Sequence, residues 1–320
     1  MSNNLNSVLL VGCGYMGREY CAVLQALQAD FGVVGRGTAS AEDFYGKTGV
    51  RPYTGGLSKY AAEREVLPQC AIVAVNLEEL YGTVGLLLSK GVKMILVEKP
   101  GAASYEQIQD LNVMAETSGA NIFVAYNRRF YSSVIKAKEL IEEDGGVSSF
   151  RFEFTEWTHK ILDLHKSSVA LGAWFLSNST HVVDLAFYLG GLPEQMSSYT
   201  MGSFDWYEKA SSFSGAGITR AGASFSYYAD WESAGRWSVE LLTKKRKLIL
   251  CPLEELRCQM RGSLAVEKLE IDDTLDRKFK PGLYLQTKAF LDGGSDLLLT
   301  LREHVKMCEL YKRMEDGSEN

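Results

Sequence analysis

The first part of the chain, about 125 residues long, alternates short apolar runs with amphipathic stretches. Runs such as Ser7–Val11 and Val92–Val97 carry apolar residues without polar alternation, which is typical of strands buried on both faces of a parallel sheet. The stretches between the runs have the apolar spacing of helices, and Ser104 is placed to cap one of them. The pattern predicts a doubly wound parallel sheet, with strands at 7–11, 31–34, 50–53, 71–75, 92–97 and 121–125, and helices that end near 28 or span 41–45, 57–65, 80–90 and 104–118.

The pattern changes near residues 126–130. A helix predicted at 132–143 is followed by 147–157, where Phe150, Phe152 and Phe154 alternate with charged or polar residues, as in a half-exposed strand. Further strand-like segments recur with few helical signals between them, near 195–203, 222–231, 237–242, 247–250 and 266–271, and the tail 283–314 is predicted to be helical. We therefore predict a second α/β domain, 127–320, with a large, mainly antiparallel open sheet and a C-terminal helix that can pack back on the first domain.

The first strand runs into a glycine-rich sequence, Gly12-Cys13-Gly14-Tyr15-Met16-Gly17, which opens a helix. In this G-x-G-x-x-G pattern, Gly12 permits the tight turn, Gly14 lets the backbone approach a pyrophosphate, and Gly17 allows close packing of helix on strand. The helix N-terminus presents N–H groups to the anion. Residues 1–126 are therefore predicted to be a Rossmann dinucleotide-binding domain, with Tyr15 and Met16 among its cofactor-binding residues.

The end of the second strand bears on the choice of cofactor. An NAD site usually offers Asp or Glu there to the ribose 2′-hydroxyl. This chain has Arg36 instead, and no carboxylate from residue 31 to residue 40. A guanidinium flanked by hydroxyls suits a 2′-phosphate by charge and by bidentate geometry, so NADP is expected to be preferred to NAD. A solvated loop arginine is the alternative.

A cation follows the strand at 92–97, in the segment Glu98-Lys99-Pro100. Ligands of open α/β sheets collect at the carboxyl ends of such strands. Proline disfavours the helical conformation of the residue before it, so the ammonium of Lys99 is predicted to face the ligand crevice. An ordinary strand exit is the alternative.

A third candidate site lies in residues 174–191, which begin polar and end apolar. They predict a helix of about three turns, capped by Asn178, Ser179 or Thr180. His181 and Asp184 would share one face near its start. A histidine there can exchange the proton that a carbinol oxygen loses or gains during hydride transfer, and a packing or capping role is the alternative.

Composition excludes several classes of protein. The 320 residues have room for two domains, and a formal charge of −6 without a long basic run gives no footprint for nucleic acid. No apolar stretch approaches a membrane span, and residues 1–6 lack the features of a signal peptide, so a cytoplasmic location is expected. The six cysteines have no C-x-x-C spacing, which indicates neither a metal site nor a disulfide framework.

Together these motifs closely resemble the Gfo/Idh/MocA family of oxidoreductases, the relatives of glucose–fructose oxidoreductase and inositol dehydrogenase. The resemblance spans nearly the whole chain and rests on the three glycines of the loop, Glu98-Lys99-Pro100, the segment 126–130, His181 with Asp184 and the glycines at 190–191, and the segment 282–291. It implies that Lys99 and His181 are catalytic and flank the substrate, and that the open sheet mediates homodimers or homotetramers. The nicotinamide is then expected near Val75, Asn76, Glu98 and Asn127.

Two departures from the family pattern stand out. Many relatives carry an acidic residue four positions before the histidine, where this chain has Ser177, so a proton relay through a carboxylate at that position is in doubt. Many also have proline and histidine where this chain continues from Asn76 into Leu77 and Glu78, which leaves the shape of the nicotinamide pocket open.

The sequence thus predicts an NADP-preferring dehydrogenase or reductase acting on a hydroxyl or carbonyl of a sugar or sugar derivative, nucleotide-linked ones included. Weaker candidates for substrate contacts are Arg129, Lys166, Trp174, Ser177, Asn178, Asp184 and Tyr284. A non-catalytic NAD(P)-binding sensor of the same superfamily is the competing class, and an imine or bilin-type reductase is an alternative among enzymes. The presence of both Lys99 and His181 favours an enzyme.

Overall fold

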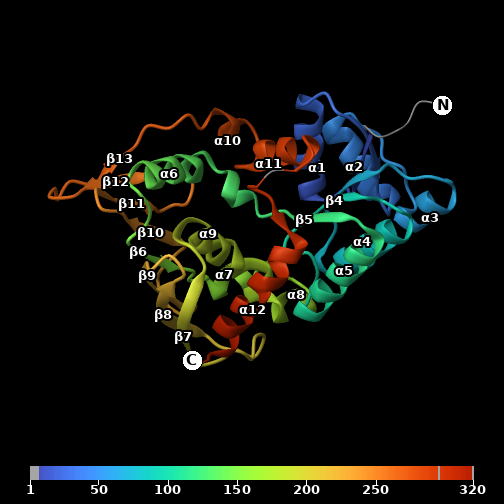
Figure 1. Cartoon of the computed structure of the whole chain (residues 1–320). Helices are drawn as coiled ribbons and strands as arrows, with labels where there is room; N and C mark the ends of the chain where they lie inside the picture. The colour runs from blue at the N-terminus through green and yellow to red at the C-terminus, as the bar shows by residue number, and fades with distance from the viewer. Residues whose placement is uncertain (1–6, 295, 319–320) are drawn as a thin grey trace. The chain divides into compact units, whose positions relative to one another are not determined.

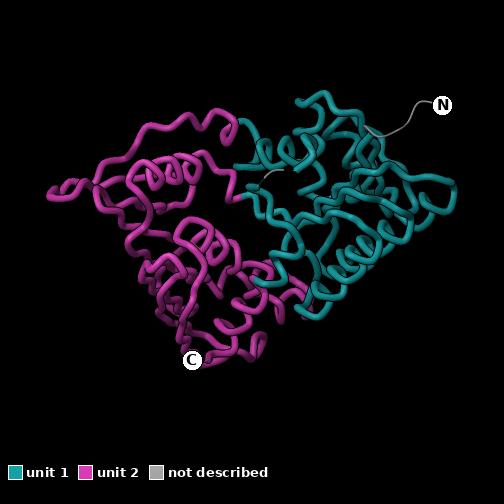
Figure 2. Tube along the Cα trace, in the orientation of Figure 1, with its two compact units in different colours: residues 1–127, 278–306 teal, residues 128–277, 307–320 magenta. Residues whose placement is uncertain are grey.

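The computed structural model describes residues 7–294 and 296–318 (Figure 1). The segment 1–6, which lacks signal-peptide features in the sequence, lies outside the described residues. The chain forms two compact units (Figure 2). Unit 1 comprises residues 1–127 and 278–306, and unit 2 comprises residues 128–277 and 307–320.

Unit 1 is built on a six-stranded sheet with the order β14-β5-β4-β3-β1-β2. All neighbouring pairs are parallel except β14 with β5, which confirms the predicted doubly wound sheet. The inner strands are almost fully buried, as their unbroken apolar runs require. The strands are β1 (Ser7–Val11), β2 (Asp30–Val34), β3 (Cys70–Val73), β4 (Met94–Val97), β5 (Asn121–Val124) and β14 (Leu299–Thr300).

Two groups of helices cover this sheet. Within unit 1, α1 packs against α2 and α11, and α4 packs against α5, on the opposite face (Figure 1). The hydroxyl of Ser104 accepts a hydrogen bond from the backbone N–H of Gln107, which confirms the predicted cap of α5. The helices are α1 (Tyr15–Ala26), α2 (Thr38–Thr48), α3 (Gly56–Ala62), α4 (Leu77–Ser89), α5 (Tyr105–Ser118) and α11 (Leu283–Leu291).

Two predicted elements of this unit are wrong. The strand expected at 50–53 is a single bridge between Val34 and Tyr53, since Pro52 has no N–H for a ladder. The helical tail expected from 283 to 314 is broken into α11 and α12 (Leu301–Asp316). Gly293 and Gly294, with φ of 100° and 92°, lie in the break before β14, and the pairing of β14 with β5 brings this part of the tail into unit 1.

Unit 2 contains an eight-stranded sheet with the order β13-β12-β11-β10-β6-β9-β8-β7. Only β6 and β9 pair in parallel, so the predicted large, mainly antiparallel open sheet is confirmed. The strands β8 and β12 were not expected from the sequence. The strands are β6 (Ser149–Glu153), β7 (Pro193–Met201), β8 (Ser212–Thr219), β9 (Ser224–Asp230), β10 (Ser238–Leu242), β11 (Arg246–Leu250), β12 (Arg257–Met260) and β13 (Glu267–Lys268).

The core of unit 2 lies where α9 packs on β6 and β10. Aromatic rings fill this layer, with Phe187 edge-on to Phe150, Phe152 and Phe225. A Cβ on Gly190 would lie 2.4 Å from the ring of Phe150, so glycine is what lets the helix approach so closely. The helical elements are η1 (Asn127–Phe130), α6 (Ser132–Glu143), α7 (Thr158–Leu162), α8 (Ser168–Gly172), the π-turn η2 (Phe175–Ser179), α9 (Thr180–Gly190) and α10 (Thr274–Lys278).

The strands of unit 2 also carry exposed apolar side chains, among them Tyr199, Ile218 and Tyr228. The homodimer or homotetramer expected through this sheet stays a prediction. Within residues 7–294 and 296–318, no helix is long and apolar enough to cross a membrane. Across the same residues, no group of three or more His, Cys, Asp or Glu side chains could hold a metal ion.

Candidate active site

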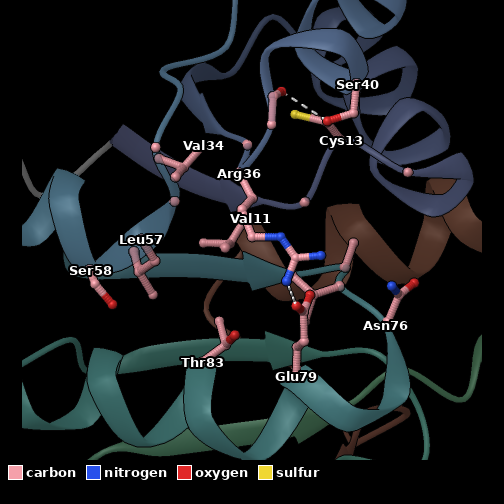
Figure 3. Close-up of a pocket in the computed structure, with 18 of the residues that line it drawn as sticks. Val11, Cys13, Val34, Arg36, Ser40, Leu57, Ser58, Asn76, Glu79 and Thr83 are labelled. Carbon is pink, nitrogen blue, oxygen red and sulfur yellow. Dashed lines mark hydrogen bonds and ion pairs between the residues drawn. The ribbon is translucent and has the colours of Figure 1, made fainter.

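A cavity of about 870 Å³ lies in unit 1 at the carboxyl ends of β1, β2 and β3 (Figure 3). Its lining comes from the glycine loop, the turn after β2, the start of α3 and residues of α4 as far as Leu86. Five of the residues predicted to bind the cofactor are in that lining: Gly12, Gly14, Arg36, Val75 and Asn76. Tyr15, Met16, Gly17, Glu98, Lys99 and Asn127 are not.

The three glycines of the loop are held in different ways. Gly12 has a φ of 124°, and a Cβ there would lie 2.2 Å from the carbonyl oxygen of Ala74. A Cβ on Gly17 would lie 2.1 Å from the carbonyl oxygen of Gly12. Gly14, by contrast, has nothing within 4 Å of that position and is the N-cap of α1 without a side-chain hydrogen bond. The open backbone and the helix N-terminus therefore fit a pyrophosphate.

Arg36 and Glu79 both line this cavity and form an ion pair with each other (Figure 3). The Arg36 side chain is 76% exposed, and Ser40 lines the same cavity. Sequence reasoning missed Glu79 because the acidic residue of a ribose site is expected directly after β2, whereas Glu79 comes from α4. A 2′-phosphate on Arg36 would have to compete with this carboxylate.

Glu98 and Lys99 follow β4 and belong to a second group of contacts in unit 1. The hydroxyl of Tyr20 donates a 2.8 Å hydrogen bond to Glu98. Burial raises the pKa of Glu98, although the Tyr20 hydrogen bond and the charges of Lys99 and Lys280 oppose that shift. His304 holds the next residue, since its Nε2–H donates to the carbonyl oxygen of Pro100 at 2.8 Å.

The predicted residues Asn127 and Tyr284 both contact the 278–306 segment of unit 1. The side-chain amide of Asn127 donates to the carbonyl oxygen of Pro281 at 2.9 Å. In the amide orientation that satisfies both of its polar atoms, Gln286 accepts from the backbone N–H of Asn127 at 3.1 Å. The ring of Tyr284 stacks on Phe279 with centroids 5.1 Å apart.

His181 is the second residue of α9 and is buried in unit 2, with its ring centroid 6.1 Å from that of Trp237. The predicted helix of about three turns is confirmed, but its predicted side-chain cap is wrong. Ser179 and Thr180 already have helical dihedral angles because the π-turn η2 leads into α9. Their hydroxyls donate elsewhere, from Ser179 to Glu156 and from Thr180 to the carbonyl oxygen of Leu176.

Glu156, which sequence reasoning did not single out, is buried beside the start of α9. It accepts hydrogen bonds from Asn178 at 2.9 Å and Ser179 at 3.0 Å, and lies 3.7 Å from the guanidinium of Arg236. Burial raises the pKa of Glu156 to about 7, although these three neighbours oppose the shift. No motif marks the position, because it follows a strand and its partners are distant in sequence.

Trp237 is the centre of this part of unit 2. The guanidinium carbons of Arg128 and Arg236 lie 4.7 Å and 4.4 Å from the centroid of its ring. We call the group formed by Arg128, Glu156, Asn178, His181, Arg236 and Trp237 the Trp237 cluster.

The remaining candidates for substrate contacts lie in varied surroundings. Arg129 and Asp184 form a buried bidentate ion pair with each other. Trp174 is buried and edge-on to Trp206, and Lys166 is exposed in the turn between α7 and α8. Ser177 is half-buried within η2, where its backbone N–H donates to the carbonyl oxygen of Ala173. Their roles in substrate binding stay predictions.

Residues 6–126 match the sequence profile of the GFO_IDH_MocA oxidoreductase family, described as an NAD-binding Rossmann fold. The matched segment, residues 6–126, is a Rossmann domain of the Gfo/Idh/MocA type. The match covers the glycine loop, the residues that line the cavity and the turn with Lys99, which indicates the nucleotide-binding domain of an NAD(P)-dependent oxidoreductase. A search of curated proteins gave no match.

Solved structures share the fold of this chain over nearly its whole length. Levoglucosan dehydrogenase in complex with NADH has a TM-score of 0.77 at 16% identity, covering 96% of this chain and 95% of that one. UDP-N-acetylglucosamine 3-dehydrogenase from Acidithiobacillus ferrooxidans has a TM-score of 0.72 at 13% identity, with coverages of 97% and 96%. The WlbA dehydrogenase from Chromobacterium violaceum, in complex with NADH and UDP-GlcNAcA, has a TM-score of 0.70 at 18% identity, with coverages of 98% and 94%.

Gly14→Ala should leave the fold of this protein intact and abolish dinucleotide binding. The added methyl meets nothing in the protein, yet it occupies the backbone face that a pyrophosphate approaches. Gly12→Ala is the matched contrast, because its methyl would strike the carbonyl of Ala74 and should lower the melting temperature itself. Calorimetry with NADPH and NADH, together with thermal unfolding, separates the two effects. Unchanged affinity in Gly14→Ala would contradict a pyrophosphate at this loop.

Glu156→Gln should change how stability depends on pH. The pKa of Glu156 is raised from 4.5 to about 7 in the folded state. The stability that the protonated carboxyl gives to the folded wild type is therefore fully present below pH 4.5 and is lost as the pH rises to about 7. The free energy of unfolding should fall by at most about 3 kcal/mol over this range, since each unit of pKa shift corresponds to about 1.4 kcal/mol. Denaturant unfolding from pH 4 to pH 8 should show that the free energy of unfolding of the glutamine variant increases relative to that of the wild type between pH 4.5 and about 7. A constant difference between the two proteins would show that Glu156 ionises normally.

Proposed function

We propose that this protein is an NADP(H)-preferring dehydrogenase or reductase acting on a hydroxyl or carbonyl of a sugar or sugar derivative. One observation carries the cofactor part of the proposal: the glycine-loop cavity has Arg36 in its lining and no carboxylate in the turn after β2. The sugar part is supported by the solved relatives, whose names include levoglucosan and UDP-N-acetylglucosamine dehydrogenases.

The proposed chemistry divides two tasks between two side chains. A bound nicotinamide supplies the hydride acceptor in the oxidative direction. The imidazole of His181 then accepts the proton of the substrate hydroxyl, and the ammonium of Lys99 stabilises the developing alkoxide. The turn that carries Lys99 is held by the hydrogen bond between His304 and Pro100 and by the contact of Tyr20 with Glu98, which supports a fixed position for Lys99 within unit 1.

Cofactor preference is expected to depend on the balance between Arg36 and Glu79. NADPH should bind more tightly than NADH, and Arg36→Asp should reverse that order, because the 2′-phosphate loses a charge-assisted hydrogen bond and meets a like charge. Glu79→Gln should tighten NADPH binding further by releasing Arg36, and should leave NADH nearly unchanged. The Arg36 contact is expected to be worth about 10–100-fold in the dissociation constant, measured by calorimetry.

Arg51→Gln is the matched control for these cofactor measurements. Arg51 is an exposed arginine of the same unit that pairs with Glu42 and does not line the cavity. Its loss should affect neither cofactor. Equal affinities of the wild type for NADPH and NADH would refute the NADP preference, and the protein would then be an NAD-dependent or dual-specificity enzyme of the same family.

His181→Ala should lower kcat by about 10²–10⁴-fold and leave NADPH affinity unchanged, since it removes proton transfer and lies outside the glycine loop. His181→Gln tests the same loss with less change in volume. His159→Ala is the control, because His159 is exposed and stacks on Trp157. Turnover is measured with NADPH and NADP⁺ against sugars and nucleotide sugars, after thermal unfolding has shown that each variant is folded.

Two results would redirect the proposal. A His181→Ala variant with near-normal kcat would remove this histidine from the chemistry. A wild type that binds NADP(H) tightly but turns over no member of the panel would favour the non-catalytic sensor, the competing function considered for the sequence.

A further inference from the structure

Two arginines share one indole ring in the Trp237 cluster. Arg128 comes from η1 and Arg236 from the segment before β10, and both guanidiniums lie within 5 Å of the centroid of the Trp237 ring. Arg236 also faces a second indole, with its guanidinium 5.1 Å from the ring centroid of Trp157. A guanidinium held over a ring by cation–π attraction keeps N–H groups that can donate to an anion.

The carboxylates around these arginines do not balance their charge. Glu156 lies 3.7 Å from Arg236, but it is buried and already accepts hydrogen bonds from Asn178 and Ser179. Its pKa of about 7 means that it carries only part of a negative charge at neutral pH. Glu254, the other carboxylate that acts on Arg128, is exposed, where solvent screens its charge.

Of these two arginines, Arg128 is the one whose positive charge is least balanced by nearby carboxylates. Its Nε is buried and has no hydrogen-bond partner within residues 7–294 and 296–318, and no ion pair of those residues includes it. Burial and the nearby charge of Arg236 lower the pKa of Arg128, while Tyr131, Glu254 and Glu156 oppose that shift. The next residue, Arg129, shows the usual solution for a buried arginine, a bidentate pair with Asp184. Arg128 has no such carboxylate.

We propose that Arg128 and Arg236 form an anion subsite beside His181, which takes a carboxylate or phosphate group of the substrate. Guanidiniums bind both groups through paired hydrogen bonds. The subsite rests on the proposed function and narrows it: the substrate is an acidic sugar derivative, a sugar acid or a sugar phosphate. His181 contacts the same indole, with ring centroids 6.1 Å apart, so the proposed subsite and the proposed proton acceptor share one neighbour in unit 2.

The test measures binding directly, without turnover. Full-length protein saturated with NADP⁺ is titrated by calorimetry with glucose, glucuronate, glucose 6-phosphate and inorganic phosphate at constant ionic strength. At least one anion should bind about 10–100-fold more tightly than glucose. Arg128→Gln and Arg236→Gln should each remove most of that difference and leave glucose affinity unchanged, and Arg236→Lys should retain part of it.

Arg151→Gln is the matched control, because Arg151 is an exposed arginine of the same unit that pairs with Glu240 on the sheet. It should not alter anion binding. Tighter glucuronate identifies a carboxylate substrate, and tighter glucose 6-phosphate or phosphate identifies a phosphorylated one.

Failure of the subsite and failure of the proposed function are distinguishable. Anion binding that is no tighter than glucose binding, or that survives in both glutamine variants while they remain folded, overturns the subsite. If a neutral sugar is also turned over, the dehydrogenase assignment stands without it. Anion binding that follows Arg128 and Arg236 supports the subsite even in a protein that shows no turnover of the tested sugars.

Discussion

Unit 2 depends on the ion pair between Arg129 and Asp184. Two hydrogen bonds, of 2.8 and 2.6 Å, join η1 to the middle of α9, and the two side chains are only 10% and 1% exposed. Such a pair gains little over apolar packing, but removing one partner costs about 3–5 kcal/mol because the other charge is left buried. The pair therefore fixes α9, which carries His181, against η1. Arg128, the neighbour of Arg129 in η1, lies over the ring of Trp237.

Most of the fold could be predicted from the sequence because its signals are local. The alternating phenylalanines of β6 mark one buried face, and the unbroken apolar runs of unit 1 mark a parallel sheet. Strand β8 could not be recognised, because most of its residues are small and two are glycines. Tertiary packing explains these two glycines. A Cβ on Gly215 would lie 2.4 Å from the ring of Tyr227 on β9, and a Cβ on Gly217 would lie 2.7 Å from the ring of Phe225 on the same strand.

Some residues of the candidate site could likewise be predicted from the sequence, and others could not. The glycine loop was predictable, since a turn, a close approach and a helix start within six residues impose a recognisable spacing. The two acidic residues of the site, Glu79 and Glu156, could not be predicted. Glu79 meets Arg36 across 43 positions of sequence, and Glu156 meets Asn178 across 22. Pairings at such separations are made by the packing of helices on sheets, and no local spacing records them.

The pairing of β14 with β5 has a consequence for the order in which the protein can fold during synthesis. Residues 7–124 supply five parallel strands, but the edge beyond β5 is covered only when Leu299 and Thr300 arrive, close to the end of the chain. Until then the ribosome-bound nascent chain carries an open strand edge, a template for unwanted pairing with other chains. The contacts of α11 with α1 and of His304 with Pro100 arrive equally late. Translation of residues 128–277, which belong to unit 2, thus precedes completion of unit 1.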